Sequence, residues 1–328
     1  MRWMITRLRA NRLRSERGAS AVIVAILLVP LIGFVAIAVD VGALYWERAQ
    51  LQNGADAAAL AIAQDCADAT GCGDSAALAA SYTNSNANDG AANVLTPVFP
   101  NNHTVIVSDS TREAGSNDSA ISHPFAALIG TTSTTVGASA TAEWGPPGAG
   151  PVLPLALSFC EFQESLPLVP GTRMSVRTDT NKICKKDPTG ADIPGGFGWI
   201  DQIPGKCEAY VNLNAVGELW LGNDPGNSVP SLCSAKLDLI KGTTVLIPIY
   251  DASRGTGQNG EYRIYAFAAF HVTGWKFSGK TSLDPAAPSC GGGNARCIQG
   301  YFEKWVSIDT AFELGGPETN SSLVKLIK

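Results

Sequence analysis

The first part of the chain carries an uncharged apolar run between an arginine-rich start and an aspartate. The run extends over 21 residues from Ala19 to Val39. At about 1.5 Å per residue, a helix of this length spans roughly 30 Å, the thickness of bilayer hydrocarbon. Pro30 and Gly33 lie inside the run, and membrane helices tolerate both residue types. The pattern predicts a transmembrane helix over residues 19–39.

A helical pattern continues beyond Asp40. Small and apolar residues recur there at spacings that place them on one helix face. The candidate helix-packing residues are Leu44, Leu51, Ala55, Ala58 and Ile62. Two interpretations of this stripe stay open: it packs beside other helices at close range, or it packs on the protein's own domain.

The continuing helix bears on whether the apolar run is kept. Ala36-Ile37-Ala38 fits the small-x-small pattern of a secretory cleavage site, so cleavage after Ala38 is one alternative. A secretory apolar region is shorter than this run, about 7 to 15 residues. We therefore expect the run to be retained as an anchor.

The rest of the chain changes from helical to strand patterns. GDSAALAASYTNSNANDGAAN, residues 73–93, suggests a short alanine-rich helix that passes into a loop. Residues 101–144 suggest a small strand, helix, strand unit. WGPPGAGPVLP, residues 144–154, is predicted to be a linker. Alternating strands follow, so we expect an α+β fold with a mainly-β C-terminal domain. The expected divisions are 1–18 (basic), 19–39 (transmembrane), 40–143 (helix and small unit), 144–154 (linker) and 155–328 (mainly β).

Charge gives the expected orientation. Six arginines precede the apolar run against one acid, Glu16: Arg2, Arg7, Arg9, Arg12, Arg14 and Arg17. The positive-inside rule keeps such a segment in the cytoplasm, so the bulk is expected outside a cell membrane that the chain crosses once. The exported part is more acidic than the whole chain with its net charge of −5. We expect no nucleic-acid partner.

Cysteine usage agrees with export. The chain has eight cysteines, all beyond the apolar run, and its three histidines are scattered. Disulfides are therefore favoured over a metal site. CADATGC and CGGGNARC each enclose a glycine-containing turn, which predicts the local pairs Cys66–Cys72 and Cys290–Cys297. The residues alone leave the pairing of the other four open.

Motifs for chemistry are sparse. GTGQNG, residues 255–260, matches a dinucleotide-binding pattern, but an alternating strand follows instead of a helix, so a hairpin loop is expected. The loop after Asp109 lacks the spacing of a D-x-S-x-S metal site. Several aromatic residues could form a sugar-binding platform, but core packing is the favoured interpretation. They are Trp144, Tyr262, Tyr265, Phe267 and Phe270. We expect no catalytic residue, no cofactor, no metal and no identified small-molecule substrate.

The first third of the chain resembles a known family. An R-G start, the apolar span, a V-D-x-G exit and the helix RAQLQNGADAAALA are together similar to TadE/TadG-like proteins of Tad (Flp) pilus assembly. The match is strong over residues 17–64, and HPFAALIGTTSTTVGASATAEW resembles the family's short helix and final strand. Later segments, such as GFGWID, are similar to the longer members found in actinobacteria.

The resemblance implies a membrane-tethered, pilin-like assembly component and not an enzyme. Its partners are then the bilayer, through residues 19–39, and other pilus or secretion-machinery proteins. It also favours pairing Cys160 with Cys184 and Cys207 with Cys233. Gly18 is present, but Ile23 stands where prepilin signals carry glutamate, so processing after Gly18 is not favoured. The alternatives are a surface adhesin on a Tad-type anchor and an exported hydrolase.

Overall fold

The computed structural model describes residues 2–68, 71–178, 182–185, 192–224 and 228–327. The helices are α1 (Arg2–Asp68), α2 (Ser75–Asn86), α3 (Phe159–Glu164) and α4 (Cys233–Ile240), with 3₁₀ turns η1 (Ala126–Ile129) and η2 (Gly257–Asn259). The strands are β1 (Ala92–Val94), β2 (Val98–Asn101), β3 (Thr104–Thr111), β4 (Ile121–Ser122), β5 (Ser133–Thr134), β6 (Gly137–Gly145), β7 (Pro147–Val152), β8 (Leu155–Ser158), β9 (Met174–Arg177), β10 (Ile183–Lys185), β11 (Asp192–Pro194), β12 (Phe197–Trp199), β13 (Ala209–Asn212), β14 (Leu219–Gly222), β15 (Thr244–Arg254), β16 (Glu261–Phe277), β17 (Lys280–Ser282), β18 (Cys297–Phe302), β19 (Trp305–Ser307), β20 (Glu313–Leu314) and β21 (Ser321–Ile327). The expected α+β class, with a long apolar N-terminal helix and a mostly β remainder, is confirmed.

The chain divides into two compact units. Unit 1 comprises residues 1–59, 75–98 and 106–140, and unit 2 comprises residues 60–74, 99–105 and 141–328. Each unit is described by itself.

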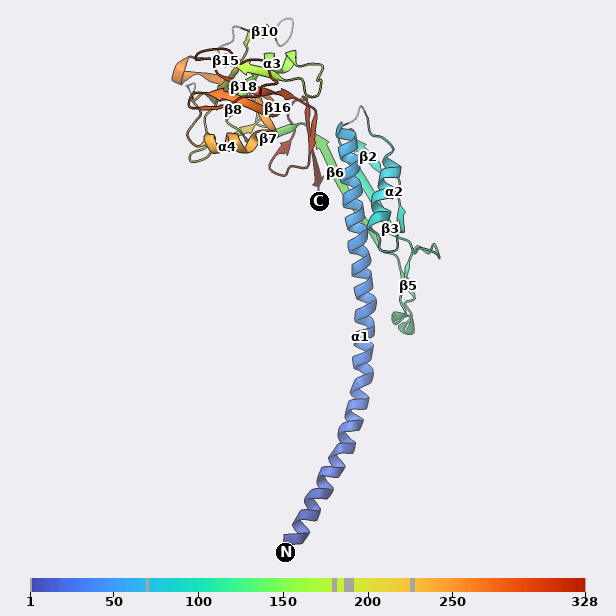
Figure 1. Cartoon of the computed structure of the whole chain (residues 1–328). Coiled ribbons are helices and arrows are strands. Elements are labelled where there is room, and N and C mark those ends of the chain that lie inside the picture. Colours follow the sequence, from blue (N-terminus) through green and yellow to red (C-terminus); the bar gives the residue numbers. More distant parts are fainter. Residues whose placement is uncertain (1, 69–70, 179–181, 186–191, 225–227, 328) are drawn as a thin grey trace. The chain divides into compact units, whose positions relative to one another are not determined.

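Unit 1 is built on α1, which runs as one helix through Pro30 (Figure 1). Within the described residues, α1 supplies the one stretch that is long and apolar enough to cross a membrane. The large apolar side chains from Val22 to Val41 are 44–72% exposed. From Leu51 onward one face of the helix is buried. The same helix therefore changes from an open apolar rod to a packed core element.

The helix α2 covers this buried face in unit 1. Gly54 of α1 leaves room for close approach, because a Cβ atom there would lie 3.1 Å from the Cα atom of Thr83. The hydroxyl of Thr83 donates to the carbonyl of Ala79 within α2, and the methyl group of Thr83 lies at the contact with Gly54. Strand β1 pairs antiparallel with β3, with Ala92 opposite Thr111.

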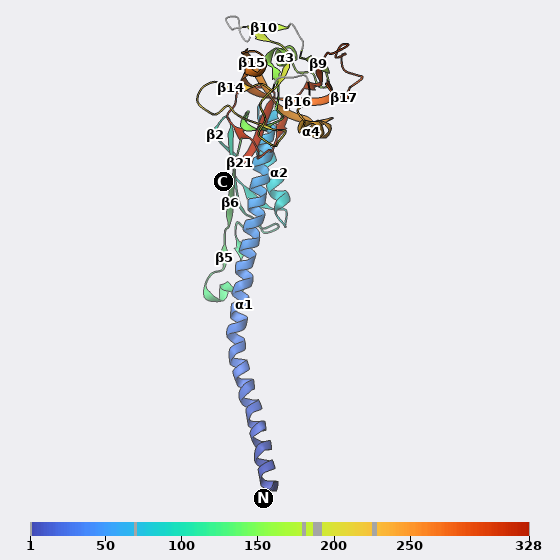
Figure 2. The same cartoon turned by 90° about the vertical axis from the view of Figure 1, so that its left-hand side faces the viewer.

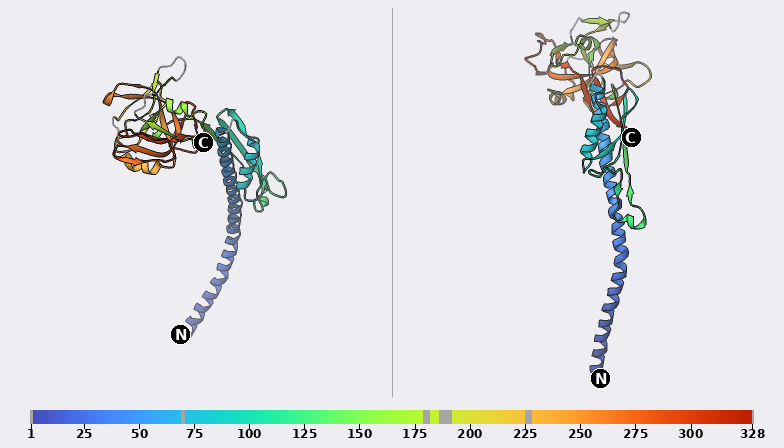
Figure 3. Two further views of the ribbon diagram at one scale, coloured as in Figure 1. Left: turned by 45° about the horizontal axis from the view of Figure 1, so that its top comes forward. Right: turned by 90° about the vertical axis from the view of Figure 1, so that its right-hand side faces the viewer.

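A small lobe completes unit 1. We call residues 121–134 the η1 lobe: β4 and β5 pair antiparallel at its base, and η1 lies between them. The N–H of His123 donates to the carbonyl of Thr132, and Gly130 ends η1 in a left-handed conformation with φ of 101°. The lobe lies beside α1 in every view (Figures 1, 2 and 3).

Unit 2 is organised by an eight-stranded sheet. Its central order is β12-β8-β15-β16-β18-β9, and β14 and β17 also pair with β16. The β15–β16 hairpin forms the middle, with Ile247 opposite Ala268, and the GTGQNG loop with η2 connects its strands. The expectation of a hairpin loop at residues 255–260 is confirmed. Strand β8 joins β15 in parallel.

Apolar side chains cover both faces of this sheet. Ile247, Ile249 and Phe270 belong to one buried cluster, whereas Leu246 and Phe267 belong to another. Successive side chains of a strand point to opposite faces, so the odd and even positions of β15 and β16 supply different cores. A sheet buried on both faces explains the nearly continuous apolar letters of VLIPIY and FAAF.

The linker expected at residues 144–154 is not a linker in the structure. Pro147–Val152 form β7, which pairs with β13 and β20 in a three-stranded sheet. Ring Cδ1 of Phe312 would lie 2.2 Å from a Cβ atom at Gly150, so the aromatic ring occupies the space that this glycine leaves. Glycines that suggested flexibility instead permit close packing in the interior.

Candidate functional site

The aspartate at the end of the apolar span is buried in unit 1. Asp40 is 5% exposed, and its Oδ2 accepts hydrogen bonds from the backbone N–H groups of Ala126 at 2.6 Å and Phe125 at 3.2 Å. The carboxylate thus satisfies free N–H groups at the start of η1, which a helix end otherwise leaves without partners. The contact ties the V-D-x-G exit to the HPFAALIG segment.

An apolar groove begins at the next residue of α1. Its volume is about 200 Å³, and it is lined by Val41, Leu44, Tyr45, Arg48 and Val136. Leu44, predicted as a packing residue, is half-buried here. The groove lies wholly in unit 1, and its lining includes one aromatic side chain, Tyr45, and one cationic side chain, Arg48.

A buried carboxyl lies on β3. Asp109 is 3% exposed, and neither of its carboxylate oxygens has a hydrogen-bond partner among the described residues. Burial, with the nearby charge of Glu47 as a smaller cause, raises the pKa of Asp109 to about 7. Burial also raises the pKa of Glu47, helped by the charges of Asp89 and Glu113. The described residues hold no cluster of three or more ligand side chains around Asp109 or elsewhere.

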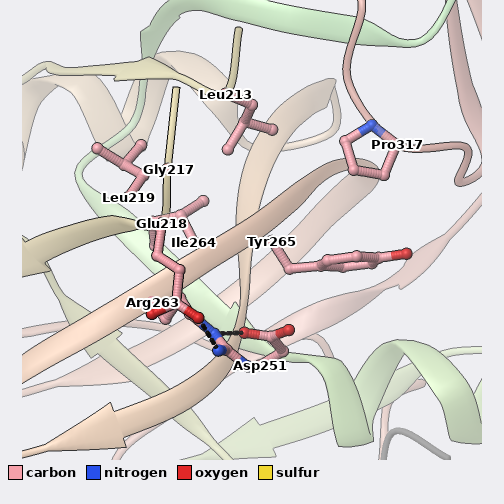
Figure 4. Close-up of a pocket in the computed structure, with 9 residues that line it drawn as sticks. All are labelled: Leu213, Gly217, Glu218, Leu219, Asp251, Arg263, Ile264, Tyr265 and Pro317. Atoms are coloured by element: carbon pink, nitrogen blue, oxygen red, sulfur yellow. Dashed lines mark hydrogen bonds and ion pairs between the residues drawn. The ribbon is translucent and has the colours of Figure 1, made fainter. Parts of the chain in front are cut away.

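A cavity of about 290 Å³ opens on the sheet of unit 2 (Figure 4). Arg263 of β16 crosses its floor, with Nε 2.7 Å from Oδ1 of the buried Asp251 and Nη1 2.5 Å from Oε1 of Glu218. The hydrogen bond to Asp251 is the main cause of the raised pKa of Arg263. A guanidinium held between two carboxylates forms an ion-pair network, and such structural networks also perturb pKa values.

A hydroxyl, an imidazole and a carboxylate also meet on unit 2. The hydroxyl of Thr244 lies 3.0 Å from Nδ1 of His271 and donates to Oε1 of Glu303. The same Nδ1 lies 3.6 Å from Oε1 of Glu303. A nucleophile relay needs one ring nitrogen for the hydroxyl and the other for the carboxylate. Both contacts use Nδ1, so the arrangement does not activate the threonine.

Of the aromatic residues considered for a sugar platform, Trp144, Phe267 and Phe270 lie in the interior, whereas Tyr262 and Tyr265 are half-buried and Tyr265 lines the cavity of Figure 4. Phe267 and Phe270 are buried on opposite faces of the sheet. Trp144 is buried, and its ring meets Phe99 edge-on with centroids 6.4 Å apart. A sugar-binding platform needs an exposed ring face, which these three rings do not offer, so packing is their role in the structure.

The cysteines form four disulfides in the structure. The bonds join Cys66–Cys72, Cys160–Cys184, Cys207–Cys233 and Cys290–Cys297. These are the pairs expected from the local turns and from the family resemblance. The pairing in the native protein stays a prediction that peptide mapping tests.

The predicted packing stripe is covered by the protein's own residues. Leu51, Ala55, Ala58 and Ile62 are buried, and Leu44 is half-buried. Burial within the chain favours the second interpretation of the stripe, packing on the protein's own domain. The role of these residues between proteins stays untested.

Sequence reasoning missed three of these features. Asp40 was noted only as a boundary, Asp109 only as a failed metal motif, and Thr244 and Glu303 were not singled out. The alternating pattern of TVIVSDST carried one signal, because it places Asp109 on the same face as the apolar residues Val105 and Val107.

Comparison with protein families identifies one segment of the chain. The family model described as Tad, putative Flp pilus-assembly TadE/G-like, matches residues 18–65. Comparison with curated proteins and with solved structures finds no match. The resemblance expected from the sequence is confirmed over residues 18–65 of α1, and it associates the chain with pilus assembly.

Proposed function

We propose that the protein is a membrane-anchored, extracytoplasmic and non-catalytic component of Tad pilus assembly, acting as a minor pseudopilin-like or accessory protein. One observation carries the proposal: the matched segment is a single helix, exposed and apolar before Asp40 and with one face buried in the protein from Leu51 onward. A helix of this form inserts residues 19–39 in a bilayer and holds the folded units outside it. Residues 19–39, which we call the apolar rod, present an exposed apolar surface to neighbouring helices.

In this proposal, partner membrane proteins contact the apolar rod, residues 19–39, and not the packing stripe further along α1. The stripe from Leu51 to Ile62 is already buried in the chain. Apolar side chains of the rod, such as Ile26 and Phe34, are exposed around the helix. In a bilayer, helices associate through van der Waals packing, which Gly33 assists because it allows close backbone approach.

The sites in unit 2 support a role without catalysis. The cavity of Figure 4 is crossed by an ion-paired arginine, and the Thr244 cluster lacks the order of contacts that a nucleophile requires. The six arginines before Ala19 support a cytoplasmic N-terminus.

Photo-crosslinking in the native cell tests this function. A photoreactive residue at Phe34 should form adducts with pilus or secretion-machinery membrane proteins, identified by mass spectrometry. Leu239 of α4 is the control, because it is equally exposed but lies outside the rod. A deletion strain should lose pili and recover them with the wild-type chain.

Two results separate the alternatives. Normal pili together with lost surface binding in the deletion strain indicate an adhesin and contradict the assembly role. A reporter that works only outside the membrane should be active when fused after residue 150. Activity of a cytoplasm-only reporter there contradicts the proposed orientation.

A further inference from the structure

The η1 lobe is tied to α1 where the apolar span ends. Oδ2 of Asp40 accepts the N–H groups of Phe125 and Ala126, which lie 85 and 86 residues further along the chain. Asp40 directly follows Val39, the last residue of the predicted transmembrane run. The hydrogen bonds therefore hold η1 at the height where the helix leaves the hydrocarbon.

The burial of α1 shows how far this cover reaches. Ala36 lies one turn before Asp40 on the same helix face, and it is half-buried although its neighbours Val35 and Ile37 are exposed. The lobe lies beside this part of α1 in all views (Figures 1, 2 and 3). One face of the last turn of the span is thus covered by protein.

The composition of the lobe suits a lipid surface. No Asp, Glu, Lys or Arg occurs between Asp118 and Glu143, in a chain whose net charge is −5. The turn reads Phe-Ala-Ala-Leu-Ile over residues 125–129, and Phe125 is 42% exposed. The ring of His123 is buried, with Nε2 2.8 Å from the hydroxyl of Thr134. An uncharged turn with an outward ring costs little to place among headgroups.

The groove after Asp40 continues the same surface along α1. Val41 opens it, and Arg48 lies nine residues beyond Val39, about 13 Å at the helical rise of about 1.5 Å per residue. Headgroup layers occupy about 5 to 8 Å on each side of the hydrocarbon. Tyr45 lies six residues beyond Val39, about 9 Å at the same rise, at the outer edge of this layer. Arg48 lies above the layer, and an arginine side chain is long enough to bring its guanidinium to the phosphates.

We propose that the η1 lobe, with the groove beside it, rests on the outer leaflet of the bilayer that α1 crosses. The lobe enters the headgroup layer, and Asp40 is the positioning residue that sets its height. This inference rests on the membrane anchoring of the proposed function. A helix alone tilts and rotates in a bilayer, whereas a helix with a second contact beside it holds unit 1 at one angle to the membrane.

Site-directed fluorescence on the full chain tests the contact. The described cysteines are all in disulfides, so one introduced cysteine accepts an environment-sensitive label without competition. The protein is reconstituted into nanodiscs of phosphatidylcholine and phosphatidylglycerol that contain lipids with a nitroxide near the headgroup. Labels are placed by Phe125→Cys in the lobe, Val35→Cys in the span and Val98→Cys at the start of β2, an exposed apolar position of unit 1 away from the lobe (Figure 1).

The labels at 35 and 125 should shift their emission to shorter wavelength and be quenched by the nitroxide lipid, whereas the label at 98 should show neither change. A label at 125 that behaves like the one at 98, while 35 is quenched, refutes the lobe contact and leaves the anchor intact. Absence of quenching at 35 refutes the anchor and the inference with it.

A second variant tests the positioning by Asp40. Asp40→Ala removes the acceptor for the N–H groups of Phe125 and Ala126, so the label at 125 should lose most of its quenching. Asp56→Ala is the matched control, because Asp56 lies on the same helix and accepts its hydrogen bond from a helical neighbour, Gln52, and not from the lobe. Unchanged quenching at 125 in the Asp40→Ala protein refutes the positioning role.

Discussion

Gly54 of α1 packs against the backbone of Thr83 of α2, where an added Cβ atom would lie 3.1 Å from the Cα atom of Thr83. This pair sets the distance between the two helices of unit 1. The face of α1 that the sequence suggested for packing beside other helices is therefore covered at Gly54 by α2 of the same chain.

Substitution of Gly54 should therefore separate the helices. We expect Gly54→Leu to destabilise the protein by about 1 to 3 kcal/mol through overpacking. Thermal unfolding of the detergent-solubilised full chain measures the change. Gly42→Leu is the control on the same helix, because no atom lies within 4 Å of a Cβ atom there. Equal melting temperatures for the two variants contradict the close contact.

The buried carboxyl of Asp109 should make stability depend on pH. Its pKa is raised from 3.8 to about 7 in the folded chain, so the folded state binds the proton more tightly than the unfolded state. The free energy of unfolding then falls as pH rises from about 4 to about 7 and stays low above pH 7. The total loss between pH 4 and pH 8 is about 4 kcal/mol at most.

Asp109→Asn removes this ionisation. The variant should melt higher than the wild type at pH 8 and nearly with it at pH 5. Asp118→Asn, an exposed acid of the same unit, is the control and should leave the pH profile unchanged. A wild-type melting temperature that stays constant from pH 5 to pH 8 argues against a buried acid.

The four disulfides predict a definite peptide map. Non-reduced digestion should give the pairs Cys66–Cys72, Cys160–Cys184, Cys207–Cys233 and Cys290–Cys297. The double variant Cys207→Ala/Cys233→Ala should lose about 2 to 4 kcal/mol, because the loop is freed in the unfolded chain. A crossed pair, such as Cys160–Cys207, or a free thiol contradicts the pairing.

Arg263 should stabilise unit 2 without any role in chemistry. Arg263→Met takes the cation away from the buried carboxylate of Asp251. Because the side chain of Arg263 is 31% exposed, we expect a cost of about 2 to 3 kcal/mol, between that of a surface pair and that of a fully buried one. Arg254→Met breaks an ion pair that is largely exposed, with Glu261, and should cost about 1 kcal/mol or less. Urea unfolding ranks the two variants, and the reverse order contradicts the network.

The apolar run should be retained in the mature protein. Mass spectrometry of the native chain should find peptides that span Ala36 to Tyr45, and the protein should sediment with membranes. Chains that begin at Val39 indicate ordinary secretion, and chains that begin at Ala19 indicate prepilin-type processing.

The sequence by itself determined the elements that depend on neighbouring residues. The apolar letters of residues 19–39 and the helical spacing from Leu44 to Ile62 predicted one long helix, and α1 is that helix. The apolar letters of TTVLIPIYDA, the alternation in EYRIYAFAAF and the glycine-rich loop between them predicted the central hairpin, which β15 and β16 form. Periodicity is a local property of the chain, so local residues suffice to reveal it.

The tertiary structure decided what each element meets. Proline and glycine at residues 147–152 read as a linker, but β13 and β20 supply partners for their backbone and Phe312 fills the space beside Gly150. The sequence marked Asp40 only as the end of the apolar run. In the structure it accepts hydrogen bonds from the N–H groups of Phe125 and Ala126, which lie 85 and 86 positions further along the chain. Each of these contacts joins two residues that are far apart in the sequence and meet only in the folded chain. The pattern of residues within either segment therefore does not reveal the contact.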